Sequence, residues 1–205
     1  MAKIKLTKGE LKKTRDALRQ YYRYLPTLQL KKQQLQIEIL RASAALEEKK
    51  RQESAKVYEA EVWTGLLSDS AVDIKPWIAP AGVTAGSRNI AGVDIPVFER
   101  TEFAPAEYDL FLTPLWVDSG VEALRVIASL RKEIKVIEEG VAILKRELRT
   151  TTQRLNLFEK VKIPEAEESI RVIKIYIGDQ MANAVGRSKM AKKKIEAAVF
   201  AEAAV

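Results

Sequence analysis

The sequence has 205 residues, enough for one domain of ordinary size, and it contains neither cysteine nor histidine. These absences exclude disulfides, thiolate zinc sites, Ser-His-Asp hydrolysis and Cys-His catalysis, because each needs one of the two residue types. Composition leaves open an enzyme built on Asp, Glu or Lys. The formal net charge is +7, and the positive charge is concentrated at the two ends of the chain, while the middle is net acidic.

The first residues, MAKIKLTKGELKK, are charged throughout and lack the apolar core of a signal peptide. No stretch approaches the roughly 18 apolar residues of a membrane span. We therefore expect a soluble, cytoplasmic protein that works at a membrane only through partners.

Residues 1–67 are predicted to form a long N-terminal helix. Thr7 and Glu10 have the spacing of a capping box, and Gly65 suits a C-terminal cap. Pro26 should bend this helix locally. Apolar residues recur every seven positions, which predicts the seam of a coiled coil. One row of the seam is Ile4, Leu11, Leu18, Leu25, Ile39 and Leu46, and the other is Tyr21, Leu28, Leu35 and Ala42.

Residues 68–118 are rich in proline and glycine and have no helical period, so they are predicted to form an insert between helices. Within the insert, RNIAGVDIPVF alternates apolar and polar residues about Gly92, which predicts a short β-hairpin. Pro96 should restrict its second strand to an edge. The candidate docking residues of the insert are Asn89, Gly92, Val93, Ile95, Pro96 and Phe98.

Residues 119–205 are predicted to form a second long helix, with Ser119 and Glu122 as its capping box. Its apolar seam changes phase after Phe158 by skipping one residue, just before Pro164. An extra residue unwinds a coiled coil locally, and proline is a recognised cause of kinks. The pattern favours one helix with a kink near Pro164 over two separate helices. The seam residues are Ile127, Leu130, Ile134, Ile137, Val141, Leu144, Leu148, Leu155 and Phe158, then Ile163, Ile170, Ile173 and Ile177.

The predicted fold is thus mainly α-helical, a long antiparallel two-helix coiled coil with a small insert that contains a β-hairpin. If the helices fold back, both termini lie together and the basic segments form one tip. Three interpretations of this tip stay open: a solvated end, a phosphate-binding surface for nucleic acid, or an end seated in a ring of partner subunits. The tip residues are Lys3, Lys5, Lys8, Lys12, Lys13, Arg187, Lys189, Lys192, Lys193 and Lys194.

Other features of the sequence favour no catalytic site. GVTAGSRN lacks the Gly-Lys-Ser/Thr ending of a phosphate loop, and the carboxylates after Pro164 fit the first turn of a restarted helix. No cofactor or metal site is expected. Tyr22, Leu30, Val136 and Ile175 lie off the seam, either as ordinary surface scatter or as contacts with further chains.

Four stretches together resemble the D subunit of V-type and A-type rotary ATPases: KLTKGELKKTRDAL, YLPTLQLKKQQL, NIAGVDIPVFE and TTQRLNLFEKVKIPEAEESIRVIK. The resemblance covers nearly the whole chain. Gly178 and Gly186 depart from the family pattern, and each costs about 1 kcal/mol in a helix. The residues that match the second-helix motif of the family are Arg154, Asn156, Leu157, Glu159, Ile163 and Pro164.

The resemblance implies a non-catalytic rotor axle that transmits torque between ATP chemistry in a hexameric head and ion movement in the membrane. It implies three kinds of partner: the catalytic and non-catalytic head subunits, the small F subunit of the stalk, and the subunit that caps the membrane rotor ring. It implies neither nucleic acid binding nor direct membrane insertion. A nucleic-acid-binding coiled coil and the shaft of an F-type ATPase are the alternatives. The Pro164 kink either makes the axle asymmetric or accommodates the F subunit.

Overall fold

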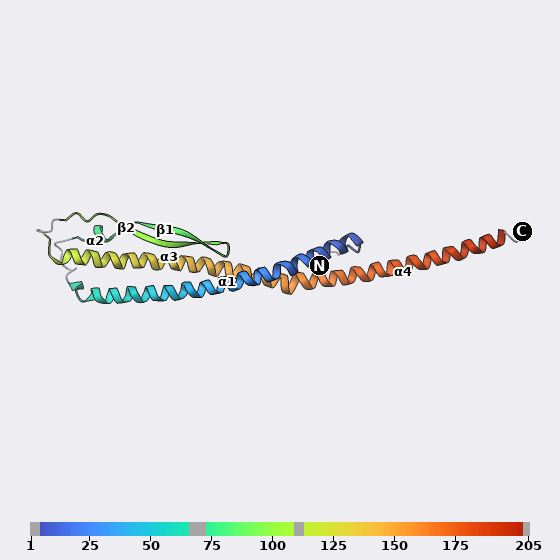
Figure 1. Ribbon diagram of the computed structural model, residues 1–205, viewed down its shortest axis with the longest axis horizontal. Helices are drawn as coiled ribbons and strands as arrows, with labels where there is room; N and C mark the ends of the chain where they lie inside the picture. The colour runs from blue at the N-terminus through green and yellow to red at the C-terminus, as the bar shows by residue number, and fades with distance from the viewer. Residues whose placement is uncertain (1–4, 66–72, 109–112, 203–205) are drawn as a thin grey trace. The chain divides into compact units, whose positions relative to one another are not determined.

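The computed structural model describes residues 5–65, 73–108 and 113–202, so that Ile4 of the predicted seam lies outside it (Figure 1). It comprises two compact units, Met1–Gln29 with Gln153–Val205, and Leu30–Thr152. The elements in chain order are α1 (Lys8–Glu61), α2 (Lys75–Ile78), β1 (Pro80–Ile90), β2 (Val93–Phe103), α3 (Trp116–Leu157), the π-helix η2 (Phe158–Lys162) and α4 (Ile163–Glu202).

Helix α1 begins where the capping box predicts. The Glu10 amide donates to the Thr7 hydroxyl at 3.3 Å, and the Leu11 amide donates to the Thr7 carbonyl at 3.0 Å. The helix continues through Pro26 and ends at Glu61. The expectation that it reaches Gly65 as a C-terminal cap is wrong, because Gly65 does not adopt the positive φ of such a cap.

Helix α3 begins at Trp116, one turn before the predicted capping box. Ser119 is therefore not the N-cap, and both Ser119 and Glu122 lie inside the helix. The Val117 amide donates to the Pro114 carbonyl at 3.0 Å, and the Val117 side chain is fully buried. Burial of this first turn outweighs the local capping preference of the sequence.

In the unit Leu30–Thr152, α1 and α3 pack as an antiparallel pair. Cross-helix ion pairs flank the seam, and they join low numbers on α1 to high numbers on α3, as antiparallel packing requires. They are Lys31–Glu147 at 2.8 Å, Lys49–Glu133 at 2.9 Å, Lys50–Glu138 at 2.9 Å and Arg131–Glu53 at 2.7 Å. Five predicted seam residues are buried here: Leu35, Ile127, Ile134, Val141 and Leu144.

In the other unit, the start of α1 lies antiparallel to η2 and α4. The ring of Tyr21 stacks on Phe158 with centroids 5.3 Å apart, and the Tyr22 hydroxyl donates to Glu167 at 2.7 Å. The phase change of the seam is confirmed, because buried positions resume at Ile163 after Leu155. The buried side chains of α4 are Ile163, Ala166, Ile170 and Ile173.

The π-helix η2 accounts for the skipped residue of the seam. A π-turn contains one residue more than an α-turn, and the Ile163 amide donates to the Phe158 carbonyl, five residues earlier. The chain is therefore helical without interruption from Trp116 to Glu202, as the continuous-helix prediction requires. Pro164 follows directly after this wide turn. The missing amide hydrogen and the bulky ring of proline disturb the helix least at this position, because the π-turn has already shifted the backbone hydrogen bonds from the α-helical pattern.

The β-hairpin is confirmed but is longer than RNIAGVDIPVF. Strands β1 and β2 pair antiparallel around a turn in which both Ala91 (φ 51°) and Gly92 (φ 76°) have positive φ. This is the geometry of a type I′ turn. Beyond Phe98, a β-bulge leaves Glu99 without a partner residue. The bulge shifts the alternation of apolar and polar residues by one position. The outer part of each strand therefore does not continue the pattern seen in the sequence near the turn. With only two strands in the sheet, Pro96 is on an edge as predicted.

The buried seam should carry most of the stability of the helical pair. Leu144 is fully buried in the seam, whereas Leu40 on α1 is 71% exposed. We expect Leu144→Ala to lower the free energy of unfolding by about 2–5 kcal/mol, because it leaves a cavity, and Leu40→Ala to change it by less than about 0.5 kcal/mol. Urea denaturation followed by circular dichroism measures both. Equal effects of the two substitutions would contradict the seam as the core.

Candidate functional site

The tip of the hairpin is held by its own polar side chains. The Asn89 amide nitrogen donates to the Asp94 carboxylate at 2.7 Å, and the Gly92 amide donates to the Asn89 side-chain oxygen at 3.1 Å. Val93, Ile95 and the other predicted docking residues lie on this hairpin, where none is fully buried. Asn89 and Gly92 therefore shape the turn, and the apolar residues behind it supply a partly exposed surface.

The hairpin lies along α3 in the same unit (Figure 1). Gly140, in the middle of α3, permits this approach: a Cβ placed there would lie 3.8 Å from the Pro96 carbonyl oxygen and 3.9 Å from the Ile95 Cβ. Gly140 is itself buried. A glycine inside a helix costs about 1 kcal/mol, and here it allows two backbones to lie close together.

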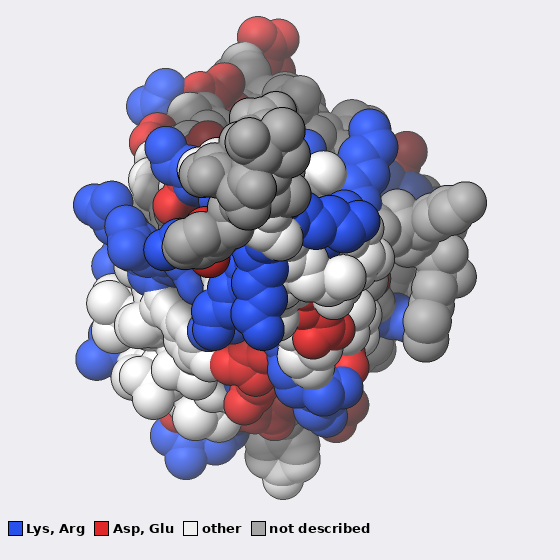
Figure 2. Space-filling model, turned by 90° about the vertical axis from the view of Figure 1, so that its right-hand side faces the viewer, with Lys and Arg blue, Asp and Glu red and all other residues white. Residues whose placement is uncertain are grey.

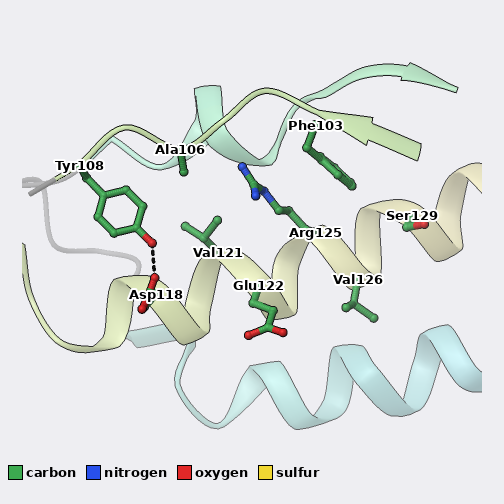
Figure 3. A pocket seen from close by; sticks show the side chains of 9 residues that line it. All are labelled: Phe103, Ala106, Tyr108, Asp118, Val121, Glu122, Arg125, Val126 and Ser129. Carbon is green, nitrogen blue, oxygen red and sulfur yellow. Dashed lines mark hydrogen bonds between the residues drawn. The ribbon is translucent and has the colours of Figure 1, made fainter. Parts of the chain in front are cut away.

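At its base the hairpin is attached to α3 by polar contacts around a hollow of about 440 Å³ (Figure 3). Arg125 donates from Nε to the Trp77 carbonyl at 2.8 Å and from a terminal nitrogen to the Ala104 carbonyl at 2.7 Å. The Tyr108 hydroxyl donates to Asp118, and this hydrogen bond raises the pKa of Tyr108 above its ordinary value. The hollow thus lies between α3 and the chain segment that leads out of the hairpin, from Phe103 to Tyr108.

Three acidic residues lie in the turns directly after Pro164, and each has a partner. Glu165 pairs with Lys162 at 3.2 Å, Glu168 pairs with Arg171 at 2.6 Å, and Glu167 accepts the Tyr22 hydroxyl. The hydrogen bond from Arg171 lowers the pKa of Glu168. In the part of the chain that the structure describes, no group of three or more Asp and Glu residues is arranged to hold a metal ion.

The two predicted basic segments are not brought together into one tip. Lys13 lines the same groove as Lys162 and Glu165, so the start of α1 lies beside the first turns of α4. Arg187 lies roughly 30 Å further along α4, at about 1.5 Å per residue. Figure 1 shows α4 continuing well past the first turn of α1. Lys3 lies outside the described residues, and the remaining nine basic residues of the predicted tip are exposed.

The prediction of one shared basic tip is wrong, because it assumed that the start of the first long helix and the end of the second lie side by side. Figure 2 shows Lys and Arg side chains on this face of the molecule together with acidic and uncharged side chains, so the face is not uniformly basic. The basic residues from Arg187 to Lys194 belong to a single helix.

From Gly178 to Val199, every residue of α4 is exposed. The helix passes through Gly178 and Gly186 without a break, although both are poor helix formers. Large apolar side chains recur along this stretch and include Ile195, which is 64% exposed. Helices in water usually depend on packing of an apolar face, and none of the described residues covers such a face on this stretch. The exposed apolar residues are Met181, Val185, Met190, Ile195 and Val199.

Three of the four off-seam apolar residues, Tyr22, Leu30 and Ile175, are exposed. On α1, Leu30 is followed at helical spacing by Ile37 and Leu40, which are also exposed. Ile37 and Leu40 line a shallow apolar groove of about 570 Å³. The exposed residues therefore include a grouped set on one face of α1.

Sequence reasoning missed the residues that attach the hairpin: Trp77, Tyr108 and Arg125. Two of these are aromatic residues in a proline-rich segment, which is a usable signal for local packing. Arg125 gives no signal, because it is one of many charged residues on a helix surface. Gly140 was detectable as a helix-interior glycine. No helix in the described ranges is long and apolar enough to cross a membrane.

Comparison with known proteins places these features in a family. Residues 10–193 match the family model described as the D subunit of ATP synthase. The V-type ATP synthase D subunit of Borreliella burgdorferi is 44% identical over 195 residues, covering 95% of this chain and 96% of the relative. The subunits of the same name from Chlamydia pneumoniae and Chlamydia trachomatis are 34% and 33% identical, and each alignment covers more than 90% of both chains.

The family model spans both units, the hairpin and the wide turn of η2, and the relatives align over nearly their full length. The chain therefore belongs to the family of ATP synthase D subunits.

Proposed function

We propose that this chain is the central-stalk subunit of a V-type ATPase, a non-catalytic axle that transmits torque between ATP chemistry in the head and ion translocation in the membrane sector. Its partners would be the catalytic and non-catalytic head subunits, the small F subunit of the stalk and the subunit that caps the rotor ring. It would act on the cytoplasmic side, attached to the membrane only through the complex.

The exposed stretch of α4 from Gly178 to Val199 carries the proposal. It combines apolar side chains, such as Met190 and Ile195, with the basic residues from Arg187 to Lys194, and all of these side chains are exposed among the residues that the structure describes. An apolar surface of this kind indicates a partner. A helix seated within a ring of head subunits would bury the apolar residues, while its lysines meet acidic groups of the ring.

The packed helices support the proposed role in torque transmission. The α1–α3 pair is joined by a buried apolar seam and by ion pairs on its flanks, so the helices resist sliding past each other. The wide turn of η2 with Pro164 disturbs the regular helical course within the other unit. We propose that this disturbance makes the axle asymmetric, so that it affects each surrounding catalytic site differently.

A rotor must move relative to the head, and the cysteine-free sequence allows a direct test of that movement. Ser188 is exposed on α4 between Arg187 and Lys189. We expect Ser188→Cys, cross-linked to a cysteine in a neighbouring head subunit of the assembled complex, to arrest ATP hydrolysis, and reduction of the cross-link to restore it. The uncross-linked variant is the control. Full hydrolysis with a complete cross-link would mean that the chain is not a rotor.

Nucleic acid binding is the second candidate function, supported only by the basic stretch of α4. That stretch lacks interleaved aromatic residues as a stacking surface. Retention on heparin together with salt-dependent DNA binding by the isolated chain would favour it.

The hairpin is proposed to regulate or dock the complex and not to support the helices. We expect replacement of Arg88–Phe98 by Asn-Gly to leave the circular dichroism signal of the helices nearly unchanged, because these residues lie outside both seams. The inserted dipeptide closes the shortened strands with a type I′ turn. ATP hydrolysis or assembly with the rotor cap should change. Loss of helical signal would instead assign the hairpin a structural role.

Pro164 tests the asymmetry. Alanine at this position restores a backbone donor, and Pro164→Ala should raise the free energy of unfolding by up to about 3 kcal/mol. Coupling between ATP hydrolysis and ion transport should fall partially, because η2 retains its extra residue. Deleting the exposed Val161 in the same variant should remove that residue and lower coupling further. Pro26→Ala in α1 is the matched control.

Coupling is measured as ions transported per ATP hydrolysed in reconstituted vesicles. If the double variant is demonstrably straight by electron microscopy yet fully coupled, the asymmetry proposal fails, and only the packing explanation of Pro164 is left.

A further inference from the structure

Two of the hydrogen bonds that attach the hairpin to α3 come from one guanidinium group, that of Arg125. Arg125 donates one hydrogen bond to Trp77, just before β1, and another to Ala104, just after β2. Phe103 is the last residue of β2, and the guanidinium carbon of Arg125 lies 5.4 Å from the centroid of the Phe103 ring. Figure 3 shows Arg125 pointing from α3 toward these segments. One side chain thereby joins the entry and the exit of the hairpin to the same helix.

The second attachment lies two helical turns away on α3. Tyr108 donates to Asp118, and the Tyr108 ring packs on the Trp77 ring with centroids 4.9 Å apart. This contact fastens the segment that follows Ala104, and it reaches the entry segment only through Trp77. The Tyr108 contact therefore helps to position the Ala104 carbonyl that Arg125 binds. Arg125 itself binds the entry and the exit segment of the hairpin directly.

The rest of the hairpin is held lightly. Every residue of β1 and β2 keeps part of its surface exposed. The approach at Gly140 is an ordinary van der Waals distance, and the hollow of about 440 Å³ beside Arg125 leaves the base incompletely packed. Few buried apolar contacts and an open base are properties of segments that open locally without global unfolding.

We propose that Arg125 is a latch that sets the docked position of the hairpin on α3, and that without it the hairpin detaches as one body while the helices stay folded. This inference goes beyond the proposed axle role and rests only on the geometry of the hairpin, so its failure would leave that role untouched. Arg125 is a positioning residue, because it acts through the hairpin.

The chemistry of arginine suits this latch. A planar guanidinium presents several donors in a fixed fork, so it can satisfy two carbonyls at once while one face lies against an aromatic ring. Lysine retains the positive charge but offers a compact ammonium group without the fork. Arg125→Lys therefore separates the role of geometry from the role of charge.

Hydrogen exchange of the full chain, read segment by segment, tests the latch. A lone two-stranded hairpin is marginally stable in water, so a detached hairpin should lose its protection. We expect Arg125→Ala to speed exchange in residues 80–103 by roughly tenfold or more, the effect of losing two charge-assisted hydrogen bonds, with exchange in the α1 and α3 seam unchanged. Arg131→Ala is the matched control, because Arg131 pairs with Glu53 of α1 and not with the hairpin.

Three outcomes of this experiment overturn the proposal. They are unchanged exchange of the hairpin in Arg125→Ala, an increase that spreads equally into the helices, and the same hairpin effect in Arg131→Ala. Arg125→Lys should resemble Arg125→Ala. Full protection with lysine would overturn the role of the guanidinium fork.

A cross-link provides the rescue. Cβ atoms at Gly140 and Ile95 would be 3.9 Å apart, within the range that a disulfide needs, and the chain has no other cysteine. We expect the double variant Ile95→Cys and Gly140→Cys to form a disulfide readily. Adding Arg125→Ala should slow the formation of this disulfide. Once oxidised, the triple variant should again protect the hairpin amides from hydrogen exchange. A disulfide that forms at the same rate with and without Arg125, or an oxidised triple variant whose hairpin stays unprotected, would refute the latch.

Discussion

The apolar seam of the long helices must face its partner helix in each unit, and the rest of the structure accommodates that requirement. Burial of the seam is the main favourable term in a two-helix structure, which has little other core. The spacing from Phe158 to Ile163 is one residue too long for an α-turn to keep both residues on the seam. The π-turn of η2 absorbs the extra residue, so that Leu155 and Ile163 are both buried within one continuous helix. Pro164 is tolerated because the hydrogen-bonding pattern is already shifted there.

Polar contacts give the structure its specificity. The ion pairs of Lys31, Lys49 and Lys50 flank the seam and are partly exposed, so each contributes little to stability by itself. Together they favour one antiparallel register, because a slip by one turn would separate each lysine from its glutamate. Arg125 acts similarly for the hairpin, where two directional hydrogen bonds define a position that its few apolar contacts leave loose.

Two parts of the described chain that pack little also suggest contact with other subunits. From Gly178 to Val199 the apolar side chains of α4 lie on the outside, and every residue of the hairpin is partly exposed. We propose that other chains of the complex cover these surfaces. The buried seam and these open surfaces divide the molecule into parts that stabilise it and parts that are available to partners.

The sequence by itself determined the long helices, their heptad seams, the phase change near Pro164 and the hairpin turn at Gly92. Each depends on local spacing or on a residue with restricted φ. Only the tertiary structure decided the rest. Helix α3 begins at Trp116 because Val117 is buried, against the local preference of Ser119. The β-bulge lengthens the hairpin beyond its visible alternation. The basic segments lie apart because α4 extends past α1, and Arg125 meets Trp77 and Ala104 across long sequence separations that no local pattern encodes.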